Sequence, residues 1–398
     1  MTPLVLSALT ATSCIGRGVS QTLATLRAAR SGLTPCAFET VMLDTYVGEV
    51  TGVDDTRLPA GLEEEFACRN NRLAWLGLLQ DGFAEAVAAA AARYGAARVG
   101  LFLGTSTSGI LDSEIAYRQR DALSGALPGT FRYRGAHNTF SVAAFARRAL
   151  KLEGPAVVVS SACSSSGKVF ASAQRAIAAG FMDAAVVGGV DSLCLTTLYG
   201  FHALQLVSAA PCRPFDLARN GISIGEAAAF ALLERTPGSL DADAVLLLGT
   251  GESSDAHHMS APHPQGRGAR AAMEQALTAA RLAASDIHYI NLHGTGTPSN
   301  DEAEACAVAA VLGPTVPGSS TKGATGHTLG AAGALEAVIC ALALREGFMP
   351  AGVNTRTIDP ALEVNYLLEN RSAPLIRVMS NSFGFGGSNC SLILGRAG

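Results

Sequence analysis

The sequence predicts an α/β protein made of two similar halves, and three observations support this. Short uninterrupted apolar runs, such as residues 155–161 (PAVVVSS) and 183–193 (DAAVVGGVDSL), indicate buried strands. The stretch between them, residues 167–180, carries apolar residues at near-helical spacing. The alternation of strand and helix begins again after about residue 240. Continuous apolar strands of this kind are usually covered by helices on both faces of the sheet.

The first half begins with an apolar stretch near the amino terminus, within residues 1–23, which is expected to form a first core strand. The helix of residues 167–180 separates two strands, so that these three elements form one strand, helix, strand unit. Strands of the first half are predicted at residues 97–105, 155–161, 183–193 and 227–234.

The second half repeats this arrangement, although no sequence repeat is evident. The halves join near residues 236–243 (TPGSLDAD), which gives an N-terminal half of residues 1–240 and a C-terminal half of residues 241–398. Strands are predicted at residues 244–249, 287–294, 316–320, 376–383 and 388–395. Helices are predicted at residues 266–283, 301–313 and 329–347.

Composition limits the class of protein. A chain of 398 residues with 48% hydrophobic and 16% charged residues is expected to bury an extensive core. A formal net charge of −4 argues against nucleic-acid binding. Nine scattered cysteines without a CxxC pair indicate reduced thiols. No apolar run approaches the roughly 20 residues of a membrane span, and no signal peptide is recognisable. We therefore expect a cytoplasmic protein without a membrane span.

Cys163 lies within the stretch SSACSSSG, where a predicted strand turns into a predicted helix. Free N–H groups and the helix dipole at such a junction favour negative charge, which predicts a more acidic, nucleophilic thiol. The alternative is a buried structural cysteine, because free cysteine is among the most buried residue types. Position alone leaves both interpretations open.

Two histidines lie at comparable places. His293 opens the stretch HGTGTPSND at the end of a predicted strand, and His327 ends TKGATGH just before a predicted helix. Strand ends that open into loops of small residues are where α/β proteins bind ligands. Together with Cys163, these histidines predict thiolate chemistry assisted by imidazoles. A metal site is the alternative, but the three residues lack the short ligand spacing of structural zinc sites.

Four motifs follow one another along the chain: SSACSSSG, HGTGTPSND, TKGATGHTLGAAGALE and NSFGFGGSN. In this order and at these separations they closely resemble the β-ketoacyl-acyl carrier protein synthases, the condensing enzymes of the thiolase superfamily. Residues 6–33, 104–109 and 213–234 resemble the same family, so that the resemblance spans nearly the whole chain. It implies a thiolase-like fold, in which the two α/β halves form a five-layered αβαβα core.

The resemblance implies a nucleophile and two histidine partners. Cys163 would accept an acyl chain, as a thioester, from the phosphopantetheine thiol of acyl carrier protein. His293 and His327 would bind the thioester carbonyl of malonyl-acyl carrier protein and promote its decarboxylation. The enolate would attack the Cys163 thioester and leave a 3-ketoacyl chain two carbons longer. This is the reaction of a 3-oxoacyl-[acyl-carrier-protein] synthase, an acyltransferase of fatty-acid or polyketide biosynthesis.

The resemblance also assigns supporting residues around these three. Lys322 and Glu336 match a pair that acts on the histidines through electrostatics and orientation. The backbone N–H groups of Cys163 and Phe385 would form an oxyanion hole for the acyl thioester. Phe383 and Phe385 resemble a gate between the acyl pocket and the pantetheine channel.

Other residues are expected to contact the carrier protein and its pantetheine arm. Thr295 and Thr297 resemble the hydroxyls that hydrogen-bond pantetheine. Arg69 and Arg72 occupy a stretch that resembles the carrier-docking region, and basic side chains suit an acidic carrier. Acyl- and malonyl-loaded acyl carrier proteins are therefore the expected partners. No bound cofactor and no metal are expected, because the substrates arrive on the phosphopantetheine arm.

Two features resemble ketosynthases of polyene pathways, such as those of aryl polyene pigments, more than housekeeping fatty-acid synthases. Residues 190–212 are unusually apolar, and Lys168 follows the nucleophile on its predicted helix. This resemblance predicts aryl or polyenoyl substrates. It also predicts either a homodimer or a heterodimer with a subunit similar to a chain length factor.

Two other functions are alternatives. A noncatalytic ketosynthase partner generally lacks the nucleophile, whereas Cys163, His293 and His327 are all present in this chain. A thiolase uses a second cysteine, and a coenzyme A-dependent starter synthase uses a Cys-His-Asn set. The paired histidines therefore favour an elongating synthase.

Overall fold

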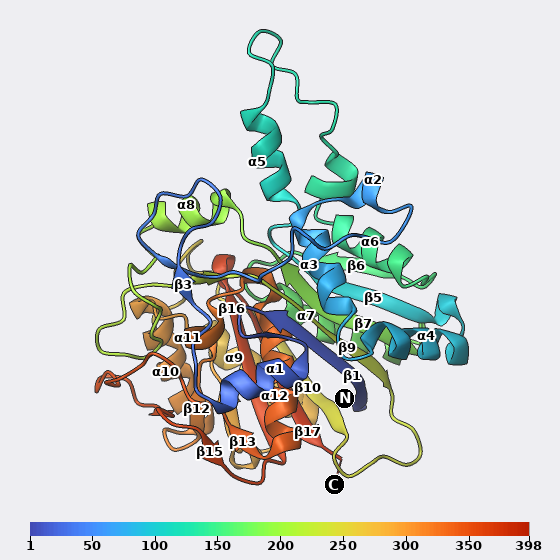
Figure 1. Ribbon diagram of the computed structural model, residues 1–398. Coiled ribbons are helices and arrows are strands. Elements are labelled where there is room, and N and C mark those ends of the chain that lie inside the picture. The colour runs from blue at the N-terminus through green and yellow to red at the C-terminus, as the bar shows by residue number, and fades with distance from the viewer. Residues whose placement is uncertain (398) are drawn as a thin grey trace.

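The computed structural model describes residues 1–397, in which a mixed β-sheet forms the centre of the molecule (Figure 1). The strands of this sheet fall into two arms. The N-terminal arm contains β1 (Leu4–Ser13), β5 (Val99–Gly104), β6 (Ala156–Val159), β7 (Ala184–Asp191) and β9 (Ala227–Arg235). The C-terminal arm contains β10 (Val245–Ser254), β11 (Tyr289–Asn291), β12 (Pro317–Ser319), β16 (Arg377–Gly384) and β17 (Ser388–Arg396).

Both arms have the same strand order and the same strand directions. The N-terminal arm runs β6-β5-β7-β9-β1, and the C-terminal arm runs β12-β11-β16-β17-β10, with the short strand β14 (Asn365–Tyr366) added in parallel beyond β12. In each arm the first three strands of this order are parallel, and the next two are each antiparallel to the strand before them. The arms join where β1 pairs with β10 at Leu4–Leu247 and Val5–Leu246. The two similar halves predicted from the sequence are therefore present, and they share one sheet.

Two helices, α7 (Ser165–Ala178) and α12 (Ala332–Glu346), contact strands of both arms and each other. Small residues let them approach closely near their N-termini. A Cβ atom on Gly333 would lie only 2.5 Å from the backbone nitrogen of Gly167, so that no larger residue fits at this position. The backbone nitrogen of Ala334 also donates to the Ser166 hydroxyl (2.9 Å). This contact brings the N-terminal ends of the two helices together.

Further helices cover the outer faces of the arms. The N-terminal arm is covered by α3 (Arg69–Leu78), α4 (Phe83–Tyr94) and α6 (Ser141–Ala149). The C-terminal arm is covered by α9 (Arg267–Ala280) and α10 (Pro298–Leu312). The helix α5 and the segment that follows it project from the body of the molecule (Figure 1).

The remaining elements are short or peripheral. The helices are α1 (Val19–Arg27), α2 (Glu63–Phe66), α5 (Ile110–Arg118), α8 (Leu195–Ala203) and α11 (Lys322–Thr325). Single helical turns are η1 (Ala96–Arg98), η2 (Tyr133–His137), η3 (Ala284–Asp286), η4 (Leu329–Ala331) and η5 (Phe385–Gly387). The short strands are β2 (Gly16–Arg17), β3 (Thr34–Pro35), β4 (Tyr46–Gly48), β8 (Ile224–Gly225), β13 (Phe348–Met349), β14 (Asn365–Tyr366) and β15 (Arg371–Ser372).

The predicted strands and helices of the two halves are observed close to their predicted bounds. The strand expected at residues 287–294 is shorter, because the backbone N–H groups of His293 and Gly294 donate to the Glu304 carboxylate instead of to a strand. The strand expected at residues 244–249 is longer, because β10 pairs with β17 as far as Ser254. Among residues 1–397, no helix is long and apolar enough to cross a membrane.

Candidate active site

Cys163 lies in the turn between β6 and α7, and the surrounding serines hold this turn. Ala162 adopts a left-handed backbone conformation (φ 51°), which reverses the chain just before the thiol. The Ser165 hydroxyl accepts from Ser161 N (2.9 Å) and donates to Ala162 O (2.5 Å), while the Ser164 hydroxyl donates to Ser161 O (2.9 Å). The serine-rich sequence therefore stabilises a tight turn that exposes Cys163 to the cavity described below.

The expected acidity of the Cys163 thiol is wrong. The residue is only 6% exposed, and burial raises the pKa of the Cys163 thiol to about 12, although Lys322 opposes this shift. Asp191 adds to the rise in pKa, while the Phe385 N–H lowers it by hydrogen bonding. The helix α7 begins at Ser165, two residues after Cys163, and its dipole does not offset the rise in pKa that desolvation of the thiol causes.

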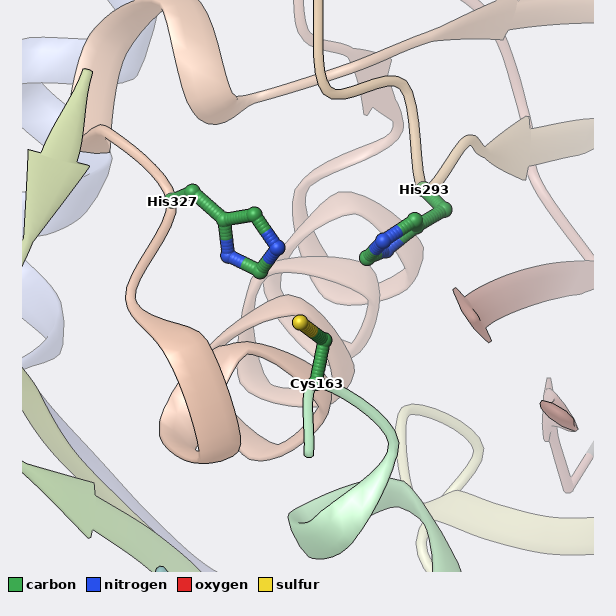
Figure 2. A group of neighbouring side chains, drawn as sticks. All are labelled: Cys163, His293 and His327. Carbon is green, nitrogen blue, oxygen red and sulfur yellow. The ribbon is translucent and has the colours of Figure 1, made fainter. Parts of the chain in front are cut away.

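His293 and His327 converge on this thiol from the other half of the chain (Figure 2). His293 follows β11, and His327 lies between α11 and η4. Their rings are 5.2 Å apart between centroids and nearly perpendicular, at 83°. The Cys163 sulfur and one ring nitrogen from each of His293 and His327 all lie within 4.8 Å of one another. The structure therefore brings together the three residues that the sequence singled out.

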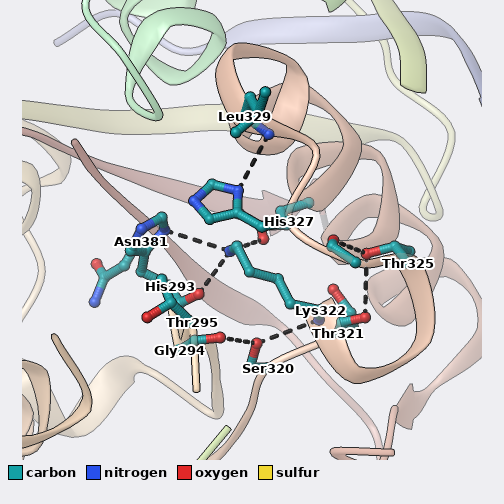
Figure 3. A network of polar contacts seen from close by, with 12 residues as sticks. His293, Gly294, Thr295, Ser320, Thr321, Lys322, Thr325, His327, Leu329 and Asn381 are labelled. Carbon is teal, nitrogen blue, oxygen red and sulfur yellow. Dashed lines mark hydrogen bonds and ion pairs between the residues drawn. The ribbon is translucent and has the colours of Figure 1, made fainter. Parts of the chain in front are cut away.

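The hydrogen bonds of the two imidazoles fix where their protons reside. Leu329 N donates to His327 Nδ1 (3.1 Å), and Lys322 Nζ contacts His293 Nδ1 (3.3 Å) (Figure 3). An ammonium group only donates, so that Nδ1 accepts in both rings and the proton is on Nε2. Burial and the positive charge of Lys322 lower the pKa values of both histidines well below 6.5. The site thus holds two neutral imidazoles, each with one free N–H donor.

Lys322 and Glu336 form a buried ion pair behind the histidines. Lys322 Nζ contacts Glu336 Oε1 and also donates to the backbone oxygen of His293 (2.6 Å). Burial raises the pKa of Glu336 to about 7, while Lys322 lowers it. This arrangement agrees with the sequence interpretation that the carboxylate, which is isolated in an apolar helix, has a buried partner. The pair holds the ammonium against His293.

Glu304 supports the histidine loop, and sequence reasoning missed it. Its carboxylate accepts from His293 N (2.8 Å), Gly294 N (2.7 Å) and Asn381 Nδ2 (3.1 Å). Burial raises the pKa of Glu304 to about 7. On the same helix Asp301 accepts from Thr295 N (3.0 Å). The signal available in the sequence was a cluster of three acidic residues, Asp301, Glu302 and Glu304, in the first half of a helix whose second half is apolar.

Asp191, at the end of β7, links the two halves near the thiol and was also missed. Its carboxylate accepts from Ser106 N (2.7 Å), Thr107 N (2.9 Å) and the Thr105 hydroxyl (2.7 Å) in the N-terminal half. It also accepts from Gly330 N (2.6 Å) in the C-terminal half. Gly330 follows Leu329, whose N–H orients His327, so that this carboxylate connects the loop after β5 to the turn that carries His327.

A cavity of about 60 Å³ lies beside the side chains of Cys163, His293 and His327. Thr295 and Thr297 line it, and their hydroxyls are hydrogen-bonded to each other (2.9 Å). Phe383 also lines it, with its ring 5.8 Å from that of His293. Phe385 contacts the ring of Phe201, at 5.5 Å between centroids. The cavity also contacts Leu206, Ile222, Asp255 and Asn389. The predicted pantetheine and gate residues therefore share one cavity with the thiol.

Arg69 is not placed as the sequence predicted, and its assignment to carrier docking is corrected. The Arg69 guanidinium is buried and paired with Glu226, Asp54 and Glu49. Arg69 is buried because α3 packs on the sheet, which the local sequence did not reveal. The Arg72 side chain is 21% exposed, and the partly exposed Glu63 pairs with it. Docking through Arg72 would have to break this ion pair and stays a prediction.

Among residues 1–397, Cys163, His293 and His327 are the group of side chains whose ligand atoms lie close enough together to hold a metal ion. The adjacent Lys322 ammonium, which contacts His293, disfavours a cation there. That no metal takes part stays a prediction.

Comparison with known proteins identifies the family. The N-terminal domain of β-ketoacyl synthases matches residues 1–238, and the C-terminal domain of the same family matches residues 244–356. The chain belongs to the β-ketoacyl synthase family. It is a ketosynthase, an acyltransferase that carries out the 3-oxoacyl-[acyl-carrier-protein] synthase condensation in fatty-acid or polyketide biosynthesis. Substrates bound to acyl carrier protein are those that this family uses.

Relatives of this ketosynthase include proteins similar over its full length. The 3-oxoacyl-[acyl-carrier-protein] synthase 2 of Coxiella burnetii is 32% identical and covers 99% of this chain, with 98% of its own length matched. The structure of a ketosynthase (ApeO) in complex with its chain length factor (ApeC) from Xenorhabdus doucetiae has 40% identity. It covers 100% of this chain and 98% of that one, with a TM-score of 0.88. The ishigamide ketosynthase/chain length factor has 28% identity, full coverage of both chains and a TM-score of 0.89.

Proposed function

We propose that Cys163, His293 and His327 are the catalytic residues of this ketosynthase. The observation that carries the proposal is their convergence from the two halves of the chain on one buried site, with donor atoms within 4.8 Å of one another. A noncatalytic ketosynthase-like subunit has no use for this arrangement. The absence of a second cysteine from the cavity lining, within residues 1–397, disfavours a thiolase.

In the first step, Cys163 Sγ attacks the carbonyl carbon of an acyl group on the phosphopantetheine arm of acyl carrier protein. A bond from this carbon to Cys163 forms, and its bond to the pantetheine sulfur breaks. The proton of the Cys163 thiol passes to the departing sulfur, because burial keeps the thiol protonated at neutral pH. The backbone N–H groups of Cys163 and Phe385 would stabilise the oxyanion of this step.

In the second step, malonyl-acyl carrier protein binds with its thioester oxygen between the two histidines. Decarboxylation releases CO₂ and leaves the electron pair of the broken bond as an enolate on the thioester. The Nε2–H donors of His293 and His327 stabilise this charge, typically by about 3 to 4 kcal/mol for each donor. The enolate carbon then attacks the Cys163 thioester, forms a carbon–carbon bond and releases the Cys163 sulfur as a thiolate, which takes up a proton from water to restore the thiol. The product is a 3-ketoacyl chain two carbons longer.

The other residues of the site position these groups and the substrate. Lys322 and Glu336 would keep His293 in the neutral form with its proton on Nε2. Thr295 and Thr297 would hydrogen-bond the amides of pantetheine, and their position along the cavity supports this role. Phe385, with Phe383 nearby, would separate the acyl pocket from the pantetheine channel. These side chains provide the groups that the reaction needs, without a bound cofactor or metal.

The two α/β halves are also proposed to be domains of a thiolase-like fold. We propose domain boundaries of 1–240 and 241–398, and a five-layered αβαβα thiolase-like fold. The contacts of α7 and α12 with strands of both arms support a central helical layer between the two arms of the sheet, each arm forming one sheet layer. The cytoplasmic location expected from the sequence stays a prediction.

We also propose that a second ketosynthase-like subunit binds at the β6 edge of the sheet. The apolar strand β6 is the edge of its arm and is only half-buried over Ala156–Val159, and such edges pair readily with another chain. Leu123, in the segment after α5, is 99% exposed. A heterodimer with a chain-length-factor-like subunit is favoured because the similar ketosynthase ApeO occurs in complex with its chain length factor. The apolar residues 190–212 and Lys168, through their resemblance to polyene ketosynthases, favour aryl or polyenoyl substrates.

The experiment that tests the proposal is intact-protein mass spectrometry after incubation with a panel of acyl-carrier proteins. Saturated, polyenoyl and aryl chains should each be compared, with and without a coexpressed chain-length-factor-like subunit. An acyl mass on Cys163 and a 3-ketoacyl product after addition of malonyl-acyl carrier protein are expected. Acylation at another residue, or no acylation with any chain, would overturn the assignment of Cys163.

A further inference from the structure

The helix α8 lies beside the cavity and lacks the means to stabilise its own N-terminus. It has nine residues, no acidic residue in its first turn, and Cys194 at its N-cap makes no side-chain capping hydrogen bond. It also contains two threonines and Gly200, which lower helix propensity. Isolated helices shorter than about 12 residues are marginal in water. Leu198 is its fully buried side chain, so that packing alone anchors it weakly.

Glu114, on the neighbouring helix α5, supplies the missing cap. One carboxylate oxygen accepts from Leu195 N (3.0 Å), and the other accepts from Thr196 N (2.6 Å). These are two of the free N–H groups at the start of α8. The negative charge also interacts favourably with the dipole of α8. The position of α8 therefore depends on a residue that lies 81 positions earlier in the chain.

The helix α8 in turn positions one wall of the cavity. It carries Phe201, which lines the cavity beside Cys163 and contacts the ring of Phe385. The cavity of about 60 Å³ is small beside the roughly 300 to 1,000 Å³ of typical ligand pockets. An acyl chain of moderate length therefore requires the Phe201 and Phe385 rings to separate. The anchoring of α8 limits how far Phe201 can move.

We propose that Glu114 is a positioning residue that sets the acyl-chain specificity of this ketosynthase, by fixing α8 and thereby holding Phe201 against Phe385. The inference rests on the proposed function, since it takes Cys163 as the site of acylation and Phe385 as part of the gate. The hydrogen bonds of Glu114 go to α8 and not to either histidine. We therefore expect decarboxylation of malonyl-acyl carrier protein, which uses His293 and His327, to respond less to Glu114 than acylation does.

The test compares Glu114→Ala with the wild-type protein. The rate of acylation at Cys163 is measured by intact-protein mass spectrometry with saturated acyl-carrier proteins of about six to fourteen carbons. The ratio of the long-chain to the short-chain rate should rise about fivefold, which is the effect of losing one helix cap. Decarboxylation of malonyl-acyl carrier protein without an acyl primer should stay within about twofold. Glu114→Gln, which keeps one acceptor oxygen, should show an intermediate ratio.

Three further variants make the result specific. Glu85→Ala removes an acidic residue from the first turn of α4, far from the cavity, and should leave the chain-length profile unchanged. Phe201→Ala should shift the profile in the same direction as Glu114→Ala, and the double variant should add nothing to Phe201→Ala alone.

The outcomes distinguish this inference from the proposed function. An equal fall in acylation at every chain length, together with an equal fall in decarboxylation, would show that Glu114 serves only the fold. An unchanged profile in Phe201→Ala would overturn the inference as well. If the wild-type protein is not acylated at Cys163 by any chain, the proposed function fails first.

Discussion

The two halves of this ketosynthase share one strand order but deliver different chemistry from equivalent places. Each arm has five matching strands, which are counted here in chain order. In the N-terminal half the third of these, β6, leads into the turn that carries Cys163, and α7 follows. In the C-terminal half the third strand, β12, leads into the segment that carries Lys322 and His327, and α12 follows. The same strand end therefore presents the proposed nucleophile in one half and a proposed hydrogen-bond donor in the other.

The second strand of each half shows the same contrast. The loop after β5 is held by the buried Asp191 carboxylate, and the loop after β11 is held by the buried Glu304 carboxylate. The first of these loops supports the site, whereas the second carries His293. The shared strand order fixes where the loops of the two halves meet. The residues on each loop then decide whether that half carries the proposed nucleophile or the groups that stabilise charge.

Removing the reacting residue of each half should separate the two half-reactions, and this is the largest effect that we expect. Cys163→Ala should abolish acylation. His293→Ala and His327→Ala should still be acylated but condense about 10² to 10³ times more slowly, because each loses one oxyanion donor. Intact-protein mass and 3-ketoacyl product formation measure the two steps, with circular dichroism as a control for folding. Wild-type condensation by Cys163→Ala would contradict the division between the halves.

Removing the Lys322 ammonium, which contacts His293, should destabilise the protein. Lys322→Met leaves Glu336 buried without its partner, which is expected to cost about 3 to 5 kcal/mol of unfolding free energy. Burial raises the pKa of Glu336 to about 7 even with Lys322 present. The cost should therefore be smaller at pH 5.5, where Glu336 is protonated, and larger at pH 8. Urea denaturation measures it.

A second substitution provides the control for that prediction. Lys322→Met combined with Glu336→Leu removes both charges and should recover most of the lost unfolding free energy. A double variant as unstable as Lys322→Met would mean that packing, rather than the unpaired carboxylate, causes the loss.

The pH dependence of the nucleophile half should differ from that of the histidine half. Because burial raises the pKa of Cys163 to about 12, its alkylation by iodoacetamide should rise about tenfold per pH unit between pH 7 and 9. Both histidines have lowered pKa values, so that decarboxylation should not decline from histidine protonation between pH 8 and 6.5. Peptide mapping separates Cys163 from the exposed Cys306. A plateau in Cys163 alkylation below pH 9 would reveal a more acidic thiol.

Removing one acceptor oxygen of Asp191, which connects the two halves, should lower the free energy of unfolding by less than the Lys322 substitution does. Asp191→Asn keeps the shape of the side chain but replaces one acceptor oxygen with a donor, which should cost about 1 to 3 kcal/mol of unfolding free energy. Asp121→Asn is the matched control, because Asp121 also accepts backbone N–H groups but is exposed, and it should change stability by less than about 0.5 kcal/mol. Thermal and urea denaturation measure both. Equal effects would mean that Asp191 does not link the halves.

The smallest effect is expected outside the site. Arg72→Gln breaks the ion pair with the partly exposed Glu63, which should cost about 0.5 kcal/mol. The KM for acyl carrier protein should stay within about twofold of the wild-type value, because Arg72 is already paired. A rise of several fold in KM, with kcat unchanged, would support a docking role for this arginine.

Local patterns in the sequence were sufficient to predict the strands and helices and to single out three side chains that the structure brings together. The apolar runs predicted the strands of both arms, because a buried strand needs uninterrupted apolar residues. The stretches around Cys163, His293 and His327 lie at strand ends, where backbone ends and small residues make room for ligands. The isolated Glu336 in an apolar helix indicated a buried partner for the same reason, since a carboxylate is rarely buried alone.

Only the tertiary structure decided how these groups behave. Desolvation depends on residues that are far apart in the chain, so that the sequence could not show that burial raises the pKa of Cys163 or that Arg69 is enclosed. The proton positions on the two imidazoles depend on Leu329 and Lys322, whose distances from the rings exist only in the folded chain. The sequence singled out Cys163 as the proposed nucleophile and the two histidines as its partners, and folding set their protonation states through burial and through contacts between the halves.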